Sequence, residues 1–420
     1  MTVRPADDEA RVAAQRRRII WTLFAISALG STGYIAAVTA GTLAAAEIAG
    51  SAGPGGLPTA TSTLGTAAAA SLLSLVMLRA GRRRGLLLGI AVGTLGAVVA
   101  LSGVVAVSLP LLLAGSALAG FANGASQLGR YVAADLVPMA QRARTIGTVV
   151  WGSTIGAVAG PNLVAPSGEI AASLGFPALA GTYFLTMVFI GMALAAAAIF
   201  LRPEPFSLAD PSAIATHPDG TPSASIATLF RRPSVRVALV TLAAGQVVMM
   251  LIMTMTPIHL TDHGHGLGTV GIVLSAHTFG MFALSPISGR LTDRFGSPMI
   301  IATGLATLAV AATLAVAAPP DSSTLLTGAL FLLGFGWNLG FVAGSAMLSR
   351  GLSLAERTRV QGVADGVVWS SAAAAGLASG FIVAAASYSL LGLLGIGLLV
   401  PPAALLLVRR NSIAVPRPAI

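Results

Sequence analysis

The chain has 420 residues, of which 55% are hydrophobic and only 9% are charged, whereas soluble domains carry about 25% charged residues. Its net charge is +10, but the arginines lie in short clusters between long apolar runs, which argues against a nucleic-acid partner. The absence of cysteine excludes disulfides and thiolate chemistry. We therefore predict an integral membrane protein whose main partner is the lipid bilayer.

A helix that crosses a bilayer needs about 20 mostly apolar residues. Marking such runs in chain order predicts an all-α protein with twelve spans, near residues 19–44, 58–78, 85–107, 110–134, 145–166, 176–201, 235–258, 268–288, 298–318, 323–347, 360–386 and 388–408. The fifth and eleventh runs are the weakest, because Gly, Ser and Ala lower their hydropathy.

Arginines occupy the N-terminal tail, the even-numbered connections and the C-terminal tail, whereas the odd-numbered connections contain none. Positive residues remain on the cytoplasmic side of a membrane. This asymmetry predicts a multi-pass protein of the cytoplasmic (plasma) membrane with both termini in the cytoplasm.

The longest connection, residues 202–233, is rich in proline and predicts a cytoplasmic linker between two six-helix bundles, residues 1–201 and 234–420. The halves share the pattern Arg-x-Arg-x-x-Gly, at Arg142–Gly147 and again at Arg357–Gly362. Duplicated halves are typical of alternating-access transporters. The repeat therefore predicts two pseudo-symmetric bundles around a central site.

A loop motif in the second half resembles that of the major facilitator superfamily, and it consists of Gly289, Asp293, Arg294 and Gly296. The resemblance implies the major facilitator fold, with a tight turn that takes part in a cytoplasmic gate. In the first half Leu78 stands at the Asp position, so no charge-based latch is expected there.

The cytoplasmic end of span four, with Arg130 and Asp135 followed by Arg142, resembles drug/proton antiporters of this superfamily. We expect Arg130 and Asp135 to form an ion pair at the gate. A glycine stripe in span five also resembles these antiporters and predicts close helix packing; it comprises Gly152, Gly156 and Gly160, followed by Pro161. Ser116 stands where the antiporters carry a mid-helix arginine, which argues against drug efflux.

Two pairs of soft ligands lie at similar predicted depth in spans seven and eight. Met249 and Met253 are four residues apart, as are His277 and Met281, so each pair shares a helix face. Both pairs begin nine residues from the outer boundary, about 14 Å deep. Thioethers and imidazole suit Cu(I), so an antiparallel hairpin of these spans predicts a copper site.

This arrangement resembles the CcoA-like branch of the superfamily, which imports copper and includes riboflavin carriers. The resemblance implies copper import, with copper as substrate rather than cofactor. Three alternatives remain open: a carrier of riboflavin-like molecules, a drug/proton antiporter, and a receptor on the same fold. Methionine pairs are also common packing residues.

Few other polar residues lie within the spans. Asn123 and Gln127 share a face of span four, where they either line a central cavity or bond a neighbouring helix. Asp365 is the best candidate for a proton carrier. The chain has no lysine and hence no nucleotide-binding P-loop, so we expect secondary transport, driven by a gradient. We expect the protein to be a monomer and not an enzyme. Further residues expected in the cavity are Gln246, Trp337 and Asn338.

Overall fold

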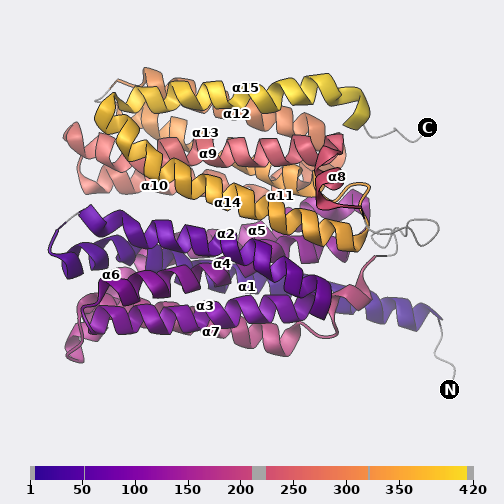
Figure 1. Cartoon of the computed structure of the whole chain (residues 1–420), viewed down its shortest axis with the longest axis horizontal. Coiled ribbons are helices and arrows are strands. Elements are labelled where there is room, and N and C mark those ends of the chain that lie inside the picture. Colours follow the sequence, from indigo (N-terminus) through magenta and orange to yellow (C-terminus); the bar gives the residue numbers. More distant parts are fainter. Residues whose placement is uncertain (1–4, 52, 211–223, 320–321, 414–420) are drawn as a thin grey trace. The chain divides into compact units, whose positions relative to one another are not determined.

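A computed structural model describes residues 5–51, 53–210, 224–319 and 322–413, and regular structure in these ranges is helical (Figure 1). Eleven of the described helices are long and apolar enough to cross a membrane. At the predicted fifth span, the helix Arg142–Asn162 falls outside this set. Its glycines, threonines and two arginines lower its hydropathy. The predicted all-helical membrane fold is confirmed.

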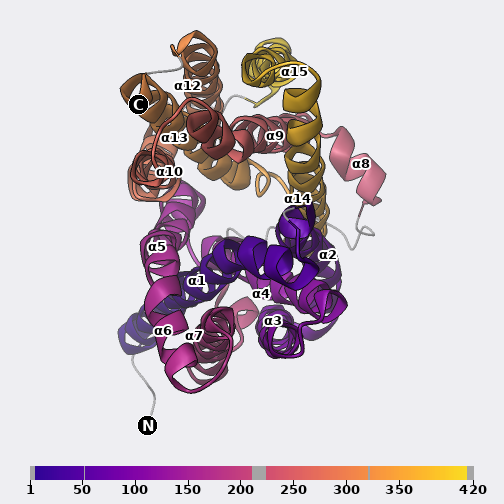
Figure 2. The same cartoon turned by 90° about the vertical axis from the view of Figure 1, so that its left-hand side faces the viewer.

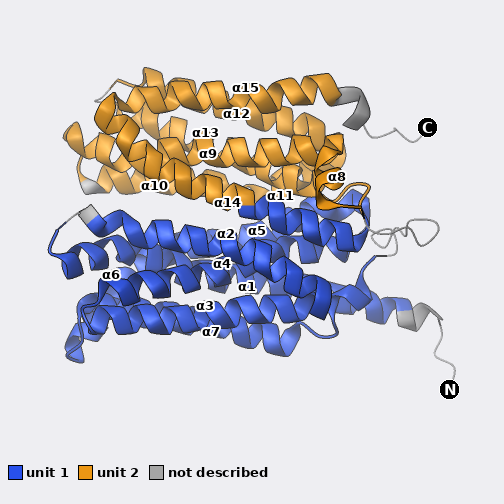
Figure 3. Ribbon diagram, in the orientation of Figure 1, with its two compact units in different colours: residues 1–221, 353–366 blue, residues 222–352, 367–420 orange. Residues whose placement is uncertain are grey.

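The chain divides into two compact units (Figure 3), and the first change of unit, after Thr221, falls inside the predicted linker. Unit 1 contains residues 1–221 and also residues 353–366. Unit 2 contains residues 222–352 and 367–420. The short segment 353–366 is the first part of a long helix, α14, Leu354–Ala385, which therefore contributes to both units.

Unit 1 is a bundle in which α1 and α4 each pack against several neighbours (Figure 2). The first helix, α1, begins at Pro5 and so extends well before the predicted span. The elements of the unit, besides the start of α14, are α1 (Pro5–Ala49), η1 (Gly53–Gly56), α2 (Leu57–Ala80), α3 (Arg82–Val105), α4 (Leu109–Asp135), η2 (Met139–Gln141), α5 (Arg142–Asn162), α6 (Val164–Ser173), α7 (Ala178–Phe200) and η3 (Pro205–Leu208).

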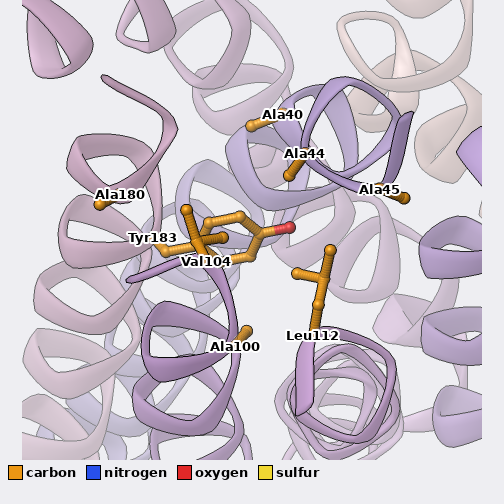
Figure 4. Packing of buried hydrophobic residues seen from close by; sticks show 8 residues of the cluster. All are labelled: Ala40, Ala44, Ala45, Ala100, Val104, Leu112, Ala180 and Tyr183. Atoms are coloured by element: carbon orange, nitrogen blue, oxygen red, sulfur yellow. The ribbon is translucent and has the colours of Figure 1, made fainter. Parts of the chain in front are cut away.

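Small residues allow the helices of unit 1 to approach closely. One buried cluster brings alanines of α1, α3 and α7 around the ring of Tyr183, with Val104 and Leu112 (Figure 4). Without a hydrophobic driving force between helices in lipid, such close backbone packing supplies much of the attraction.

Unit 2 is also a helical bundle, in which α13 packs along α10 and α12, and α9 packs along α13 and α15. Besides the remainder of α14, its elements are α8 (Ile226–Arg231), α9 (Pro233–Asp262), α10 (Leu267–Phe282), α11 (Ser285–Phe295), α12 (Ser297–Ala317), α13 (Ser323–Met347) and α15 (Tyr388–Ile413).

The eighth span is broken, whereas a single helix over 268–288 was expected. α10 ends at Phe282 and α11 begins at Ser285. Pro286 explains the interruption, because proline lacks an amide hydrogen and its ring clashes with the carbonyl four residues earlier. That carbonyl belongs to Phe282, the last residue of α10.

The loop motif of the second half is mostly helical, so the expected turn is confined to its last residue. α11 continues to Phe295, and Gly296 turns the chain with φ +86° and ψ +149°. Gly81 makes the same turn between α2 and α3, with φ +96° and ψ +160°. A positive φ favours glycine, so both halves retain the turn although only one retains the aspartate.

Candidate functional site

A buried ion pair joins α4 to the first part of α14 within unit 1. Nη2 of Arg130 lies 2.8 Å from Oδ1 and 3.0 Å from Oδ2 of Asp365. The hydroxyl of Tyr131 also donates to Oδ1, at 3.1 Å. Both charged side chains are 1% exposed. Asp365 is thus held by one guanidinium and one phenol, with no water-facing side.

Asp135, at the end of α4, binds two other arginines. Its Oδ2 lies 2.6 Å from Nη2 of Arg82, and its Oδ1 lies 3.5 Å from Nη1 of Arg357. The expected pairing of Arg130 with Asp135 is therefore wrong. Residues five apart point about 140° away from each other on an α-helix, so these two side chains of α4 face different neighbours.

The expectation of no charge-based latch in the first half stays a prediction, although an ion pair does lie beside its turn. Arg82 follows the Gly81 turn directly and supplies the cation, while Asp135 of α4 supplies the anion that the motif lacks. The repeat in the sequence pointed to one member of this cluster, because Arg357 holds in the second half the position that Arg142 holds in the first. Nothing in the sequence indicated that Tyr131 would bind Asp365.

Arg142, the first residue of α5, is only 2% exposed, and within the described part of the chain its three guanidinium nitrogens have no hydrogen-bond partner. Its electrostatic neighbours are Arg357, which repels it, and Asp135 and Asp210, which attract it. The cluster thus contains a buried cation that lacks a direct anion.

The two amides of α4 are both hydrogen-bonded within unit 1. Asn123 donates from Nδ2 to Oγ1 of Thr66 on α2, at 3.3 Å. Gln127 accepts from Nη1 of Arg130 at its Oε1, at 3.1 Å. Gln127 thereby holds the guanidinium that binds Asp365, and Asn123 ties α4 to α2.

The glycine stripe of α5 packs on the backbone of α1. A Cβ on Gly152 would lie 2.6 Å from the carbonyl oxygen of Phe24, and a Cβ on Gly156 would lie 2.5 Å from the carbonyl carbon of Ser31. Gly160 is less crowded, with its nearest atoms at 3.1 Å. Pro161 is exposed in the last turn of the helix.

In unit 2, Asn338 of α13 bonds both sides of the break in the eighth span. Its Nδ2 donates to the carbonyl of Met281 and to Oγ of Ser285, each at 2.6 Å, and its Oδ1 accepts from Oγ of Ser288 at 2.5 Å. Asn338 is fully buried. One amide therefore satisfies polar groups that the interrupted helix leaves free.

Gln246 and Trp337 bind each other rather than presenting free polar groups. The indole Nε1 of Trp337 donates to Oε1 of Gln246 at 2.8 Å. The indole stacks on Phe341, with ring centroids 4.4 Å apart, and meets the edge of Phe282. A cavity of about 10 Å³ beside Trp337 is too small for a solute.

His277 is buried on α10 and bonded on one side only. Its Nδ1 lies 2.9 Å from the carbonyl oxygen of Leu330 on α13. A carbonyl can only accept, so Nδ1 carries the hydrogen and Nε2 keeps its lone pair. Within the described residues, Nε2 has no hydrogen-bond partner.

The methionines of the expected copper site lie on the same two helices. Met249 is buried, and Met253 and Met281 are half-buried. However, α10 packs mainly along α13, and α9 packs along α13 and α15, so α9 and α10 share only a short contact. The side-by-side hairpin assumed from the sequence is therefore not the main packing of these helices.

The remaining motif residues lie on or just after α11. Gly289 is buried, and the guanidinium of Arg294 lies over the ring of Phe295, 5.2 Å from its centroid. Asp293 is half-buried and has a partner. Gly296 forms the turn described above.

Some known proteins are similar to this chain in fold, and others are similar in sequence. The human organic anion transporter MFSD10 (TETRAN) matches with a TM-score of 0.72 at 17% identity, covering 93% of this chain and 99% of that one. The transporter FucP in its outward conformation matches with a TM-score of 0.71 at 14% identity, covering 94% and 99%. At such low identity these matches concern the fold alone.

Three bacterial transporters are similar in sequence. The uncharacterized MFS-type transporter YdeG of Bacillus subtilis is 37% identical, covering 89% of this chain and 88% of its own length. YddS of the same species, also described as uncharacterized, is 38% identical over 87% and 85%. The riboflavin transporter RfnT of Brucella anthropi is 30% identical over 88% and 90%.

The family model of the Major Facilitator Superfamily matches residues 20–377 and 248–419. With the helical membrane fold and these relatives, the match identifies a multi-pass secondary transporter and not an enzyme. The chain belongs to the major facilitator superfamily.

Proposed function

We propose that this transporter carries a small organic solute of the riboflavin class across the cytoplasmic membrane by alternating access. The observation that carries the proposal is the similarity to the riboflavin transporter RfnT, which is 30% identical and extends over 88% of this chain. Since the match covers 88% of the chain, it extends into both halves.

The broken eighth span supports a solute site in unit 2. Interrupted helices at membrane depth are typical of transporter binding sites, because irregular backbone is tolerated in lipid only where protein or solute satisfies it. Here Asn338 bonds Met281, Ser285 and Ser288 around the break. A solute with several hydroxyl groups, such as a flavin, could exchange bonds with these groups.

Uptake of radiolabelled riboflavin into proteoliposomes tests this proposal. Purified wild-type protein should accumulate riboflavin under an imposed proton gradient, and an ionophore should abolish the accumulation. Asn338→Ala should slow uptake, whereas Thr303→Ala, at an exposed threonine of α12, should not. If riboflavin neither enters nor competes while another solute is transported, the substrate proposal is wrong.

Copper is the second candidate substrate, and it is favoured by His277. A ring held by a backbone carbonyl at Nδ1, with a buried lone pair at Nε2, is the usual arrangement of a metal-binding histidine. Met249 and Met253 of α9, and Met281 on the same helix as His277, would supply thioethers. The limited contact between α9 and α10 places this candidate second.

Copper uptake by the same proteoliposomes distinguishes the two candidates. If copper is the substrate, His277→Ala and Met249→Ala should each reduce ⁶⁴Cu uptake at least tenfold, whereas Met192→Ala, at an exposed methionine of α7, should leave it unchanged. Undiminished uptake in the His277 and Met249 variants would exclude the Met/His site.

For gating, we assign the cytoplasmic gate of the first half to Asp135, Arg142 and the start of α14, and proton coupling to Asp365 with Arg130. The first part of α14 groups with unit 1 and carries both Arg357 and Asp365, so two ion pairs hold it there. In the second half, the gate role falls to the loop motif Gly289, Asp293, Arg294 and Gly296.

A further inference from the structure

Two histidines project from the last turns of α9, at the end that the arginine distribution predicts to face outward. His259 and His263 are four residues apart and share one helix face, and their ring centroids are 4.5 Å apart at an interplanar angle of 55°. Paired histidines at this spacing can chelate one metal ion from a single helix. His259 is half-buried and His263 is exposed, so an ion could reach both.

The ring of His259 is fixed by contacts from another helix. It stacks on the ring of Tyr388, with centroids 4.2 Å apart and an interplanar angle of 12°. The hydroxyl of Tyr388 in turn shares a hydrogen bond of 2.9 Å with Oγ1 of Thr256, one turn earlier on α9. Because Tyr388 is buried and bonded, it limits the orientations available to His259.

The ring of His263 is fixed by a bond to the backbone. Its Nδ1 lies 2.7 Å from the carbonyl oxygen of His259. Since that oxygen can only accept, Nδ1 carries the hydrogen and Nε2 is left with its lone pair. A backbone carbonyl on the far nitrogen is the usual second partner of a metal-binding histidine.

The end of α9 is itself well defined. Gly264 adopts φ +80°, and the amides of Gly264 and His265 donate to the carbonyls of Thr261 and Leu260. These two bonds form a Schellman cap, which closes the helix in a rigid turn. His263 thus lies at the cap position of an ordered helix end.

The separation of the two rings fits a shared ion. Two imidazole nitrogens at adjacent positions of a square-planar metal such as Cu²⁺, about 2.1 Å from it, place the ring centroids about 4.6 Å apart, close to the observed 4.5 Å. Asp262 also lies near enough to act electrostatically on His259. No group of three His, Asp or Glu side chains suited to a metal occurs among the described residues, so water would complete the coordination.

We infer that His259 and His263 form a two-histidine site for a divalent transition metal at the end of α9. By the general order of affinities, Cu²⁺ binds most tightly, Zn²⁺ and Ni²⁺ bind more weakly, and Mg²⁺ and Ca²⁺ do not bind. The site is separate from His277 and independent of the transported solute.

Titration of the full-length protein with Cu²⁺ tests the site, using detergent-purified protein with an affinity tag that contains no histidine. Wild type should bind about one equivalent, and its electron paramagnetic resonance spectrum should show coupling to two imidazole nitrogens. His259→Ala and His263→Ala should each weaken binding at least tenfold and remove one nitrogen from the spectrum.

The matched control is His277→Ala, which should bind Cu²⁺ at this site as wild type does even if copper transport is lost. Zn²⁺ should also protect His259 and His263 of the unmodified protein from diethylpyrocarbonate, as read by mass spectrometry, which avoids any folding defect of a variant. The inference would be overturned if the double variant His259→Ala/His263→Ala bound Cu²⁺ with wild-type affinity and an unchanged nitrogen coupling. It would also be overturned if the spectrum of the wild type showed no nitrogen coupling.

Discussion

Arg130 of α4 and Asp365 of α14 form a fully buried ion pair within unit 1, although 235 positions separate them in the chain. Asp365 is the second-last residue of the α14 segment that groups with unit 1. A charge so deep is tolerated only with a partner. This pair therefore makes the packing of that segment depend on one guanidinium.

Removing Arg130 alone should cost far more stability than removing both charges. Arg130→Met leaves the carboxylate of Asp365 buried without its cation, which typically costs about 3–5 kcal/mol. The double variant Arg130→Met/Asp365→Leu should recover most of this loss. Thermal unfolding in detergent measures the three proteins, and a double variant no more stable than Arg130→Met would contradict the explanation.

Asp365→Asn separates proton coupling from solute binding. The amide keeps the shape of the side chain, and its oxygen can accept from Arg130 and Tyr131, but it cannot exchange a proton. We expect pH-driven accumulation to fall at least tenfold while solute counterflow continues. Glu169→Gln, at an exposed position of α6, is the control and should accumulate normally. Normal accumulation by Asp365→Asn would assign coupling elsewhere.

Alanine substitutions along α5 should destabilise in the order of their predicted clashes. Gly156→Ala and Gly152→Ala place a Cβ against the backbone of α1, and overpacking of this kind costs about 1–3 kcal/mol. Gly160→Ala should cost less. Gly191→Ala in α7, where no atom lies within 4 Å, should be neutral or stabilising. Melting temperatures that do not follow this order would refute the close α1–α5 packing.

Asn338→Leu should loosen the break between α10 and α11. The substitution leaves the carbonyl of Met281 and the hydroxyls of Ser285 and Ser288 without their partner, at about 1–3 kcal/mol for each group that stays buried and unpaired. Hydrogen exchange should rise across residues 281–288. Ser288→Ala removes only one of these bonds, so its effect should be smaller, and equal exchange in both variants would argue against the amide as the main clamp.

Substitution by methionine should change the stability of the protein in opposite directions at Arg142 and at Arg357. Arg142 is buried without a hydrogen-bond partner among the described residues, so Arg142→Met should raise stability by about 1–3 kcal/mol. Arg357→Met removes a partner of Asp135 and should lower it. Unfolding midpoints of the two variants provide the test, and destabilisation by both would mean that Arg142 has an essential role in this cluster.

Most of the fold could be predicted because its main determinants are local. Apolar runs predicted a helix at each span, and the fifth was the weakest because glycine serves packing in α5 and lowers its hydropathy. The break after Phe282 was missed because residues 268–288 are apolar enough overall to be taken for one helix, even though they include Pro286. The turn at Gly81 lies inside the predicted connection between the second and third spans, and it is kept although the first-half motif has lost its aspartate.

The pairing of side chains could not be read from spacing along the chain. Arg130 and Asp135 are near in sequence, yet each binds a residue brought in by another helix. The bond from His277 to Leu330 uses a backbone carbonyl, and carbonyls carry no sequence signature. The ring of Tyr388 that orients His259 likewise comes from another helix.

The amide of Asn338 also has an evolutionary consequence. Two of its three bonds join residue 338 to serines 50 and 53 positions earlier in the chain. In an alignment of homologues, chains that lose this asparagine should lose Ser285 and Ser288 with it, or else regain an uninterrupted eighth helix. Co-variation among these three columns would then mark which relatives have kept the broken helix.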